Sequence, residues 1–275
     1  MVLCDGLGCD GFAWKYLGPE LKTRFRVLRW HYRGHGKSPA PGKASDIGVE
    51  QIIDDLEFLL KTLAIDKAVL FGHSMGVQIA LEFHRRHAER LLGLVLLCGS
   101  YGNPLDTWHD HTLLRSAFPF VRQAVERYPD LAKRLAGLVM KTDLAVTFAM
   151  KTELNPDLMR RDDMVPYFDH LAEMTPLAFV RTLDSLKDHS AWDHLGAIGV
   201  PTLVVAGERD RFTPAWLSRR MAEAIPSAEL LLVKGGSHTA PLECPELVGR
   251  TVRKFLNERV LAPPAAKPAR KRRKT

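Results

Sequence analysis

Short runs of Val, Ile and Leu alternate along the chain with segments of helical periodicity, and this alternation limits the fold more than any other feature. The apolar runs are Met1–Cys4, Phe25–Trp30, Ala68–Phe71, Leu92–Leu97, Thr202–Ala206 and Glu229–Val233. The segments of helical periodicity are Phe12–Lys22, Val49–Leu63, Met75–His87, Pro214–Ala224 and Glu246–Asn257. Apolar strands separated by amphipathic helices are typical of βαβ units. The pattern therefore predicts an α/β fold with a doubly wound, mainly parallel sheet between two layers of helices.

Residues 100–195 break this alternation. They contain no convincing strand, and their helical stretches are separated by prolines at positions 104, 119, 129, 156, 166 and 176. The segment is also rich in bulky apolar residues, most of which we expect to build its own core. A helical insertion of this size between two strands predicts a lid. We therefore expect an α/β core formed by residues 1–99 and 196–260, with residues 100–195 inserted as a helical lid or cap.

The positive charge of the chain is concentrated at its end. The formal net charge is +7, from 39 basic and 32 acidic residues. The last nine residues, Lys267 to Thr275 (KPARKRRKT), hold six of the basic residues and no acid, so the remainder has 33 against 32. We interpret residues 261–275 as a basic disordered tail that can bind anions weakly. No specific nucleic-acid partner is expected, and the oligomeric state is left open.

The cysteines and the N-terminus favour a reducing compartment. Cys4, Cys9, Cys98 and Cys244 form no CxxC pair and have no regular spacing, which argues against a zinc site or a disulfide framework. The first residues lack the basic start and apolar centre of a signal peptide. The longest apolar run, near residues 91–98, is too short to cross a bilayer. These features predict a cytoplasmic protein without a membrane span.

A serine between two glycines follows the third apolar run, in the sequence Gly72-His73-Ser74-Met75-Gly76. A G-x-S-x-G turn joins a strand to a helix so tightly that side chains at the glycine positions would collide. The serine hydroxyl then stands clear of the sheet. The N–H of Met75, at the start of the helix, is left without a helical partner and can stabilise an anion. The pattern predicts a nucleophilic serine at Ser74.

A serine nucleophile needs a base that is held by an acid. Of the eleven histidines, His238 follows the last apolar run in a glycine-rich loop, at the sheet edge where sites of parallel sheets collect. Asp210 follows the preceding strand, and its neighbours Arg209 and Arg211 are expected to help keep it ionised. The chain order Ser74, Asp210, His238 is that of nucleophile-elbow hydrolases.

With these residues the chain resembles the α/β-hydrolase fold superfamily, in its serine hydrolase branch of esterases, lipases and haloperoxidases. The resemblance extends from Met1 to about Val260. The matching motifs are DGLG at Asp5–Gly8, RGHGKS at Arg33–Ser38, GHSMG at Gly72–Gly76, GERDRFTP at Gly207–Pro214 and GGSH at Gly235–His238. The resemblance implies a catalytic triad of Ser74, Asp210 and His238, and it implies no metal or cofactor.

The family also supplies a second oxyanion donor from the loop after the first strand, usually from the residue that follows a His-Gly pair. Here the pair is Asp5-Gly6, so the resemblance assigns this role to the backbone N–H of Leu7, beside that of Met75. An aspartate at this position removes a side chain that usually orders the loop. Such enzymes also usually begin with a β-hairpin before this strand, whereas Met1 almost opens the strand here. An open sheet edge would cost stability or recruit a partner.

The implied function is hydrolysis of a carboxylic ester or a related acyl bond of a small, hydrophobic substrate. Haloalkane dehalogenases and epoxide hydrolases of this fold have an aspartate where this chain has Ser74, which argues against their chemistry. An acyltransferase, a perhydrolase, a carbon–carbon bond hydrolase and a non-catalytic ligand receptor of the same fold remain alternatives. A metal site at Asp106, His109, Asp110 and His111 is a weaker one, because solvated polar residues explain that cluster equally well.

Overall fold

The computed structural model describes residues 1–43, 46–108 and 113–262. At its centre lies a sheet of six strands in the order β2-β1-β3-β4-β5-β6, in which every neighbouring pair is parallel. The strands are β1 (Val2–Cys4), β2 (Leu28–Arg29), β3 (Ala68–His73), β4 (Leu91–Leu97), β5 (Thr202–Gly207) and β6 (Ala228–Val233). The α/β fold with a parallel sheet predicted from the sequence is confirmed.

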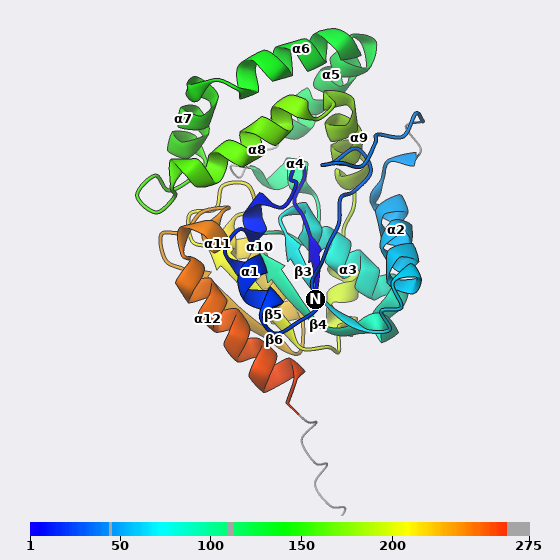
Figure 1. Cartoon of the computed structure of the whole chain (residues 1–275), viewed down its shortest axis with the longest axis vertical. Helices are drawn as coiled ribbons and strands as arrows, with labels where there is room; N and C mark the ends of the chain where they lie inside the picture. The colour runs from blue at the N-terminus through cyan, green and yellow to red at the C-terminus, as the bar shows by residue number, and fades with distance from the viewer. Residues whose placement is uncertain (44–45, 109–112, 263–275) are drawn as a thin grey trace, which may run out of the picture.

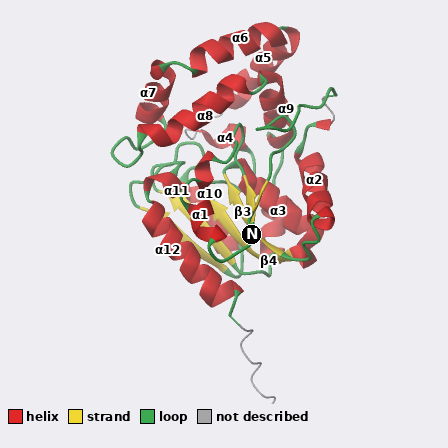
Figure 2. Cartoon of the chain, viewed as in Figure 1, coloured by secondary structure: helices red, strands yellow, loops and turns green. Residues whose placement is uncertain are grey.

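Helices cover both faces of the sheet (Figures 1 and 2). One face packs against α2 (Val49–Thr62), α3 (Met75–His87) and α10 (Ala215–Ala224), and the other against α1 (Leu17–Lys22) and α12 (Pro245–Phe255). Successive residues of a strand face opposite layers, so Leu70 lies in the first core and Phe71 in the second. Burial on both faces explains why these strands read as continuous apolar runs rather than as alternating patterns.

Six α-helices of the described residues are inserted between β4 and β5 and lie over the carboxyl ends of the strands (Figure 1). They are α4 (Pro104–Thr107), α5 (Leu113–Arg127), α6 (Pro129–Met140), α7 (Asp143–Thr152), α8 (Arg161–Glu173) and α9 (Pro176–Leu186). Part of their apolar surface is buried: Val146, Met164 and Phe168 form one cluster with Leu242 of the core. Other bulky side chains remain outside, and Phe120 and Phe148 are 74% and 65% exposed.

The structure differs from the sequence prediction mainly at the first helix and the second strand. The predicted helix over 12–22 is divided into a 3-10 turn at Phe12–Trp14 and α1. Pro19 explains the division, because proline lacks the N–H of a helix interior but fits the first turn, where that N–H has no partner. The second strand has two residues rather than six, and it forms the edge of the sheet beside β1.

The described residues also form several shorter elements. They include the 3-10 helices Ala88–Arg90 and Trp192–Ala197, the helix α11 (Ala240–Glu243) and a π-helical turn at Leu256–Val260 that extends α12. The four cysteines are free thiols. Within the three described ranges, no helix has both the length and the apolar character needed to cross a bilayer. The predicted tail falls, from residue 263 on, outside the described residues.

Candidate active site

Ser74 lies in a strained turn between β3 and α3. Its backbone has φ 54° and ψ −117°, which a residue with a side chain adopts only when its surroundings enforce it. Gly72 and Gly76 allow the close backbone packing around this turn. A Cβ atom at Gly72 would clash with the carbonyl group of Gly76, and one at Gly76 would clash with the carbonyl oxygen of Cys4. The N–H of Ser74 donates to the carbonyl oxygen of Leu97 at 3.0 Å, which anchors the turn to β4. The elbow therefore has the geometry expected from its sequence.

The three residues predicted to act together are joined by hydrogen bonds. The distance from Ser74 Oγ to His238 Nε2 is 2.9 Å, and His238 Nδ1 lies 2.9 Å from Asp210 Oδ2 and 3.1 Å from Oδ1. An ionised carboxylate only accepts hydrogen bonds, so Nδ1 carries the proton of a neutral imidazole. Nε2 is then an acceptor and faces the serine hydroxyl. This is the arrangement in which a histidine can take a proton from a serine.

The Asp210 carboxylate is held by its own loop rather than by the neighbouring arginines. Its Oδ1 accepts the N–H groups of Phe212 and Thr213 at 2.9 and 2.8 Å, and Oδ2 accepts the Thr213 hydroxyl at 2.8 Å. Arg211 instead donates to the carbonyl oxygen of Thr152 at 2.6 Å. The Asp210 side chain is fully buried. Hydrogen bonds to the charged form therefore offset its desolvation.

Thr213 has a role that sequence reasoning missed. With Pro214 after it, Thr213 looks like the N-cap of the following helix. In the structure α10 begins at Ala215, Pro214 is the capping residue, and no side chain caps the helix. The threonine hydroxyl bonds to Asp210 instead. A hydroxyl three residues after an acidic loop residue carries no local signal that distinguishes the two roles.

Two buried residues hold the loop that carries His238. His73 Nε2 lies 3.1 Å from the carbonyl oxygen of His238, and burial lowers the pKa of His73 to about 4, so a neutral ring donates this bond. Glu243 accepts the N–H of Ser237 at 2.6 Å and also the Ser237 hydroxyl. Neither contact was anticipated, because each joins residues through the tertiary fold or a loop closure that no sequence pattern marks.

The loop after β1 brings Leu7 to the same site. Leu7 and Met75 both line the cavity that holds Ser74. Among the described residues, the N–H groups of Leu7 and Met75 have no acceptor, which leaves them available to an anion beside Ser74. Met75 is the first residue of α3, where the positive end of the helix dipole adds to this potential.

Asp5 orders this loop, contrary to the expectation that replacing the usual histidine would remove an ordering side chain. Its Oδ1 accepts the indole N–H of Trp14 at 2.5 Å, and its carbonyl oxygen accepts the Tyr32 hydroxyl at 3.0 Å. All three side chains are buried. The aspartate thus connects the loop to two aromatic residues of the core through hydrogen bonds.

We expect the Asp5→Asn variant to gain stability relative to the natural protein as the pH rises. Burial raises the pKa of the Asp5 carboxyl from 3.8 to about 7. Between these values the unfolded chain has released this proton and the folded chain has not, so the natural protein loses stability with increasing pH. Asparagine keeps an oxygen for Trp14 and has no proton to lose. Between about pH 4.5 and about pH 8, the unfolding free energy of Asp5→Asn minus that of the natural protein should rise by on the order of 3 kcal/mol.

Urea unfolding of both proteins at the two pH values measures this shift. Asp10→Asn, in the same loop, is the matched control. An equal difference between the natural protein and Asp5→Asn at both pH values would contradict the assignment.

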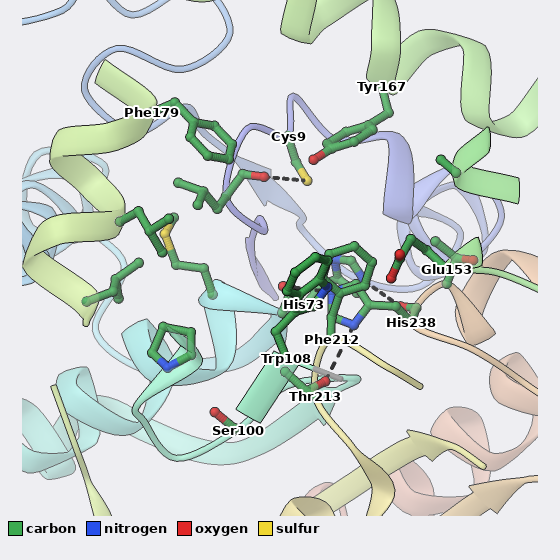
Figure 3. A pocket seen from close by; sticks show the side chains of 18 of the residues that line it. Cys9, His73, Ser100, Trp108, Glu153, Tyr167, Phe179, Phe212, Thr213 and His238 are labelled. Atoms are coloured by element: carbon green, nitrogen blue, oxygen red, sulfur yellow. Dashed lines mark hydrogen bonds between the residues drawn. The ribbon is translucent and has the colours of Figure 1, made fainter. Parts of the chain in front are cut away.

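A cavity of about 360 Å³ opens onto Ser74 and His238 beneath the inserted helices. Its walls are mainly apolar and include Phe12, Leu105, Met164, Phe168, Phe179 and Leu183. Figure 3 shows Tyr167 and Phe179 reaching into this space from opposite sides. The Phe212 ring packs on His238 with 4.9 Å between centroids. The site therefore combines a short polar chain with an apolar chamber suited to a small molecule.

Of the four residues of the alternative metal site, only Asp106 lies within the described residues. Asp106 pairs with Arg115 at 2.8 Å, whereas His109, Asp110 and His111 lie outside the described residues. In the described ranges no three His, Cys, Asp or Glu side chains are grouped so that they could hold a metal ion.

His31 and His35 contribute to the structure of their own loop, where His31 Nδ1 accepts the N–H of Lys37 at 3.1 Å.

Comparisons with known proteins agree with this geometry. The family model described as alpha/beta hydrolase fold matches residues 1–245. Epoxide hydrolase 3 of Xenopus tropicalis is 25% identical over 266 residues, which cover 94% of this chain and 71% of the relative. The putative carbamate hydrolase RutD of Rhizobium rhizogenes is 26% identical, covering 94% and 93%.

A solved structure supports the same conclusion. The thermophilic esterase from Thermogutta terrifontis is 25% identical and superposes with a TM-score of 0.72, covering 93% of this chain and 88% of the esterase. The family match spans most of the sequence, and it includes the strands, the elbow at Ser74 and the loops that carry Asp210 and His238. The chain therefore belongs to the α/β hydrolase fold family.

Proposed function

We propose that this protein is a serine hydrolase that cleaves a carboxylic ester, or a related acyl bond, of a small hydrophobic substrate through an acyl-enzyme. The observation that carries the proposal is the continuous hydrogen-bond chain from Asp210 through His238 to Ser74, which ends in an apolar cavity. A general base in contact with a serine hydroxyl, and itself oriented by a carboxylate, is the arrangement that makes serine a nucleophile.

The proposed reaction has two halves. His238 Nε2 takes the Ser74 proton while Oγ attacks the ester carbonyl carbon, and His238 then donates this proton to the leaving alcohol oxygen. A water molecule, deprotonated by His238, then attacks the acyl carbon. The bond from this carbon to Ser74 Oγ breaks, Oγ takes the proton back from His238, and the acid leaves. The N–H groups of Leu7 and Met75 stabilise the negative oxygen in both halves, each by about 3 kcal/mol in comparable sites. Asp210 holds the imidazole in the required tautomer throughout.

Residues 100–195 are proposed to act as the lid over this reaction. The inserted helices supply Met164, Phe168 and Phe179 to the cavity wall, while the α/β core supplies the reacting groups. A chamber walled by apolar groups excludes water from the reacting centre and strengthens the electrostatic interactions within it. It also favours apolar acyl or alcohol groups over charged ones.

The residue at the nucleophile position distinguishes among the reactions that the names of the similar proteins state. Their names include an esterase, a carbamate hydrolase and an epoxide hydrolase. Epoxide hydrolases of this fold use an aspartate as nucleophile, whereas this chain has Ser74. The serine therefore favours acyl transfer to water over epoxide opening.

A chain-length series of p-nitrophenyl esters tests the substrate class. We expect the highest kcat/KM for acyl groups of about four to eight carbons and a fall for longer chains, because the cavity is at the small end of ligand sites. Equal or rising rates up to palmitate would contradict a small enclosed acyl site. No turnover of any ester by the folded protein would contradict the esterase proposal and favour a receptor.

A further inference from the structure

We propose that Gln78 presents a hydrogen-bond acceptor to the substrate, so that the preferred substrate carries a hydroxyl or amide N–H close to the scissile bond. This inference rests on the proposed function and names its substrate class more closely. Gln78 is four residues after Ser74, one helical turn or about 6 Å along α3. It lines the same cavity and is otherwise almost fully buried.

A chain of side chains behind Gln78 determines which end of its amide faces the cavity. Gln78 Nε2 lies 3.1 Å from His189 Nδ1, and His189 Nε2 lies 3.2 Å from Glu82 Oε2. Arg85 Nε donates to that same Glu82 oxygen at 3.1 Å, so this oxygen acts as an acceptor. Gln78, Glu82 and Arg85 are spaced i, i+4 and i+7 and so share one side of α3.

The direction of each bond follows from the carboxylate. Glu82 can only accept, so His189 Nε2 must donate to it. His189 Nδ1 faces the Gln78 amide nitrogen, which can only donate, so Nδ1 accepts an N–H from Gln78. The amide nitrogen of Gln78 is thereby committed to His189. The amide oxygen, which accepts no bond within the described ranges, remains for the cavity.

The backbone around His189 fixes this arrangement. The carbonyl oxygen of His189 accepts the N–H of Asn103 at 3.0 Å, and the next residue, Ser190, forms a β-bridge with Gly102. Gly102 has no room for a side chain, because a Cβ there would clash with the carbonyl group of His189. The histidine is therefore held on both sides, and Gln78 has little freedom to turn its amide over.

Two other hydroxyl groups of the cavity wall already have partners. The Ser100 hydroxyl donates to the carbonyl oxygen of Gly102 at 2.9 Å, and that of Thr213 donates to Asp210. An amide oxygen in an apolar chamber loses free energy unless a donor reaches it. A substrate hydroxyl or N–H satisfies it, whereas a plain alkyl group leaves it unpaired. The site should therefore discriminate between the two by about tenfold.

Matched esters test this discrimination. The pairs are p-nitrophenyl hexanoate with its 3-hydroxyhexanoate, and propyl hexanoate with 2-hydroxyethyl hexanoate, which place the added hydroxyl on the acyl or the alcohol side. For one pair, kcat/KM of the natural protein should favour the hydroxylated ester about tenfold, and Gln78→Met should remove the preference. Equal kcat/KM within both pairs, or a preference that survives in Gln78→Met, would overturn the proposal.

Variants of His189 test whether the contacts from Gln78 through His189 to Glu82 orient the Gln78 amide. The measured quantity is again the ratio of kcat/KM between the hydroxylated and the plain ester. His189→Leu removes the acceptor and should reduce the preference, whereas His189→Asn, whose Oδ1 can take the place of Nδ1, should restore it in part. His194→Leu is the matched control, since His194 Nε2 lies 2.8 Å from His84 Nδ1 of the same helix but does not contact Gln78. An equal loss of preference in His194→Leu and His189→Leu would contradict the chain.

A binding measurement distinguishes failure of this proposal from failure of the proposed function. In a Ser74→Ala background, calorimetry with hexanamide and 3-hydroxyhexanamide measures recognition without turnover. Tighter binding of the hydroxylated amide that depends on Gln78 would support the inference even if no ester were hydrolysed. Equal affinities, together with equal kcat/KM in both ester pairs, would overturn it while leaving the hydrolase proposal intact.

Discussion

Replacing Ser74 with alanine is expected to lower kcat for ester hydrolysis by about 10⁵- to 10⁶-fold, which is the effect of removing the nucleophile from a complete triad. The substitution removes only the hydroxyl group. Its partner His238 stays in place in the wall of the cavity. Initial rates with a p-nitrophenyl ester, corrected for spontaneous hydrolysis, measure the loss.

The matched control for this variant is Ser185→Ala. Ser185 lies on α9, and its hydroxyl donates to the carbonyl oxygen of Thr182 at 2.8 Å within the same helix. Circular dichroism and urea unfolding establish that both variants are folded. If Ser74→Ala kept more than about a hundredth of the natural activity, hydrolysis would have to use another group, because losing a nucleophile costs far more.

The second large effect is expected for Asp210→Asn, which should lower kcat by about 10⁴-fold. Oδ1 of Asp210 accepts two backbone N–H groups, so the amide oxygen of asparagine will occupy its place. The amide nitrogen then replaces Oδ2, which faces His238 Nδ1. An N–H at this position stabilises the tautomer with the proton on Nε2, and such a ring cannot accept the proton of Ser74.

Asp54→Asn is the matched control for Asp210→Asn. Asp54 lies on α2 at the surface, where it pairs with Arg86 at 2.5 Å. A loss of less than about tenfold in Asp210→Asn would indicate that the tautomer of His238 does not depend on this carboxylate, since the tautomer effect is about a thousand times larger.

Much of the fold could be predicted because its elements are local patterns. The run at residues 68–71 is buried on both faces and followed by a glycine elbow, and β3 and α3 lie where the sequence places them. The three residues of the proposed triad each follow a strand. In a parallel sheet the carboxyl ends of all strands share one edge, which is why they could be grouped without coordinates.

The remaining features depend on contacts between distant segments. The Gln78–His189 bond joins residues 111 positions apart, and the Trp14–Asp5 bond depends on a turn whose shape the sequence did not predict. Thr213 had two local uses for its hydroxyl, and the burial of Asp210 decided between them. Tertiary packing determines these contacts, so hydrophobic periodicity and turn residues do not predict them.

The central claim is that Ser74 is an activated nucleophile, and covalent labelling by a fluorophosphonate tests it most directly. Intact-mass and peptide mass spectrometry of the labelled protein should locate one adduct, on Ser74, and none in Ser74→Ala. Labelling should be slowed strongly in Asp210→Asn and little changed in Asp54→Asn. An unlabelled natural protein, or an adduct that persists in Ser74→Ala, would contradict the account.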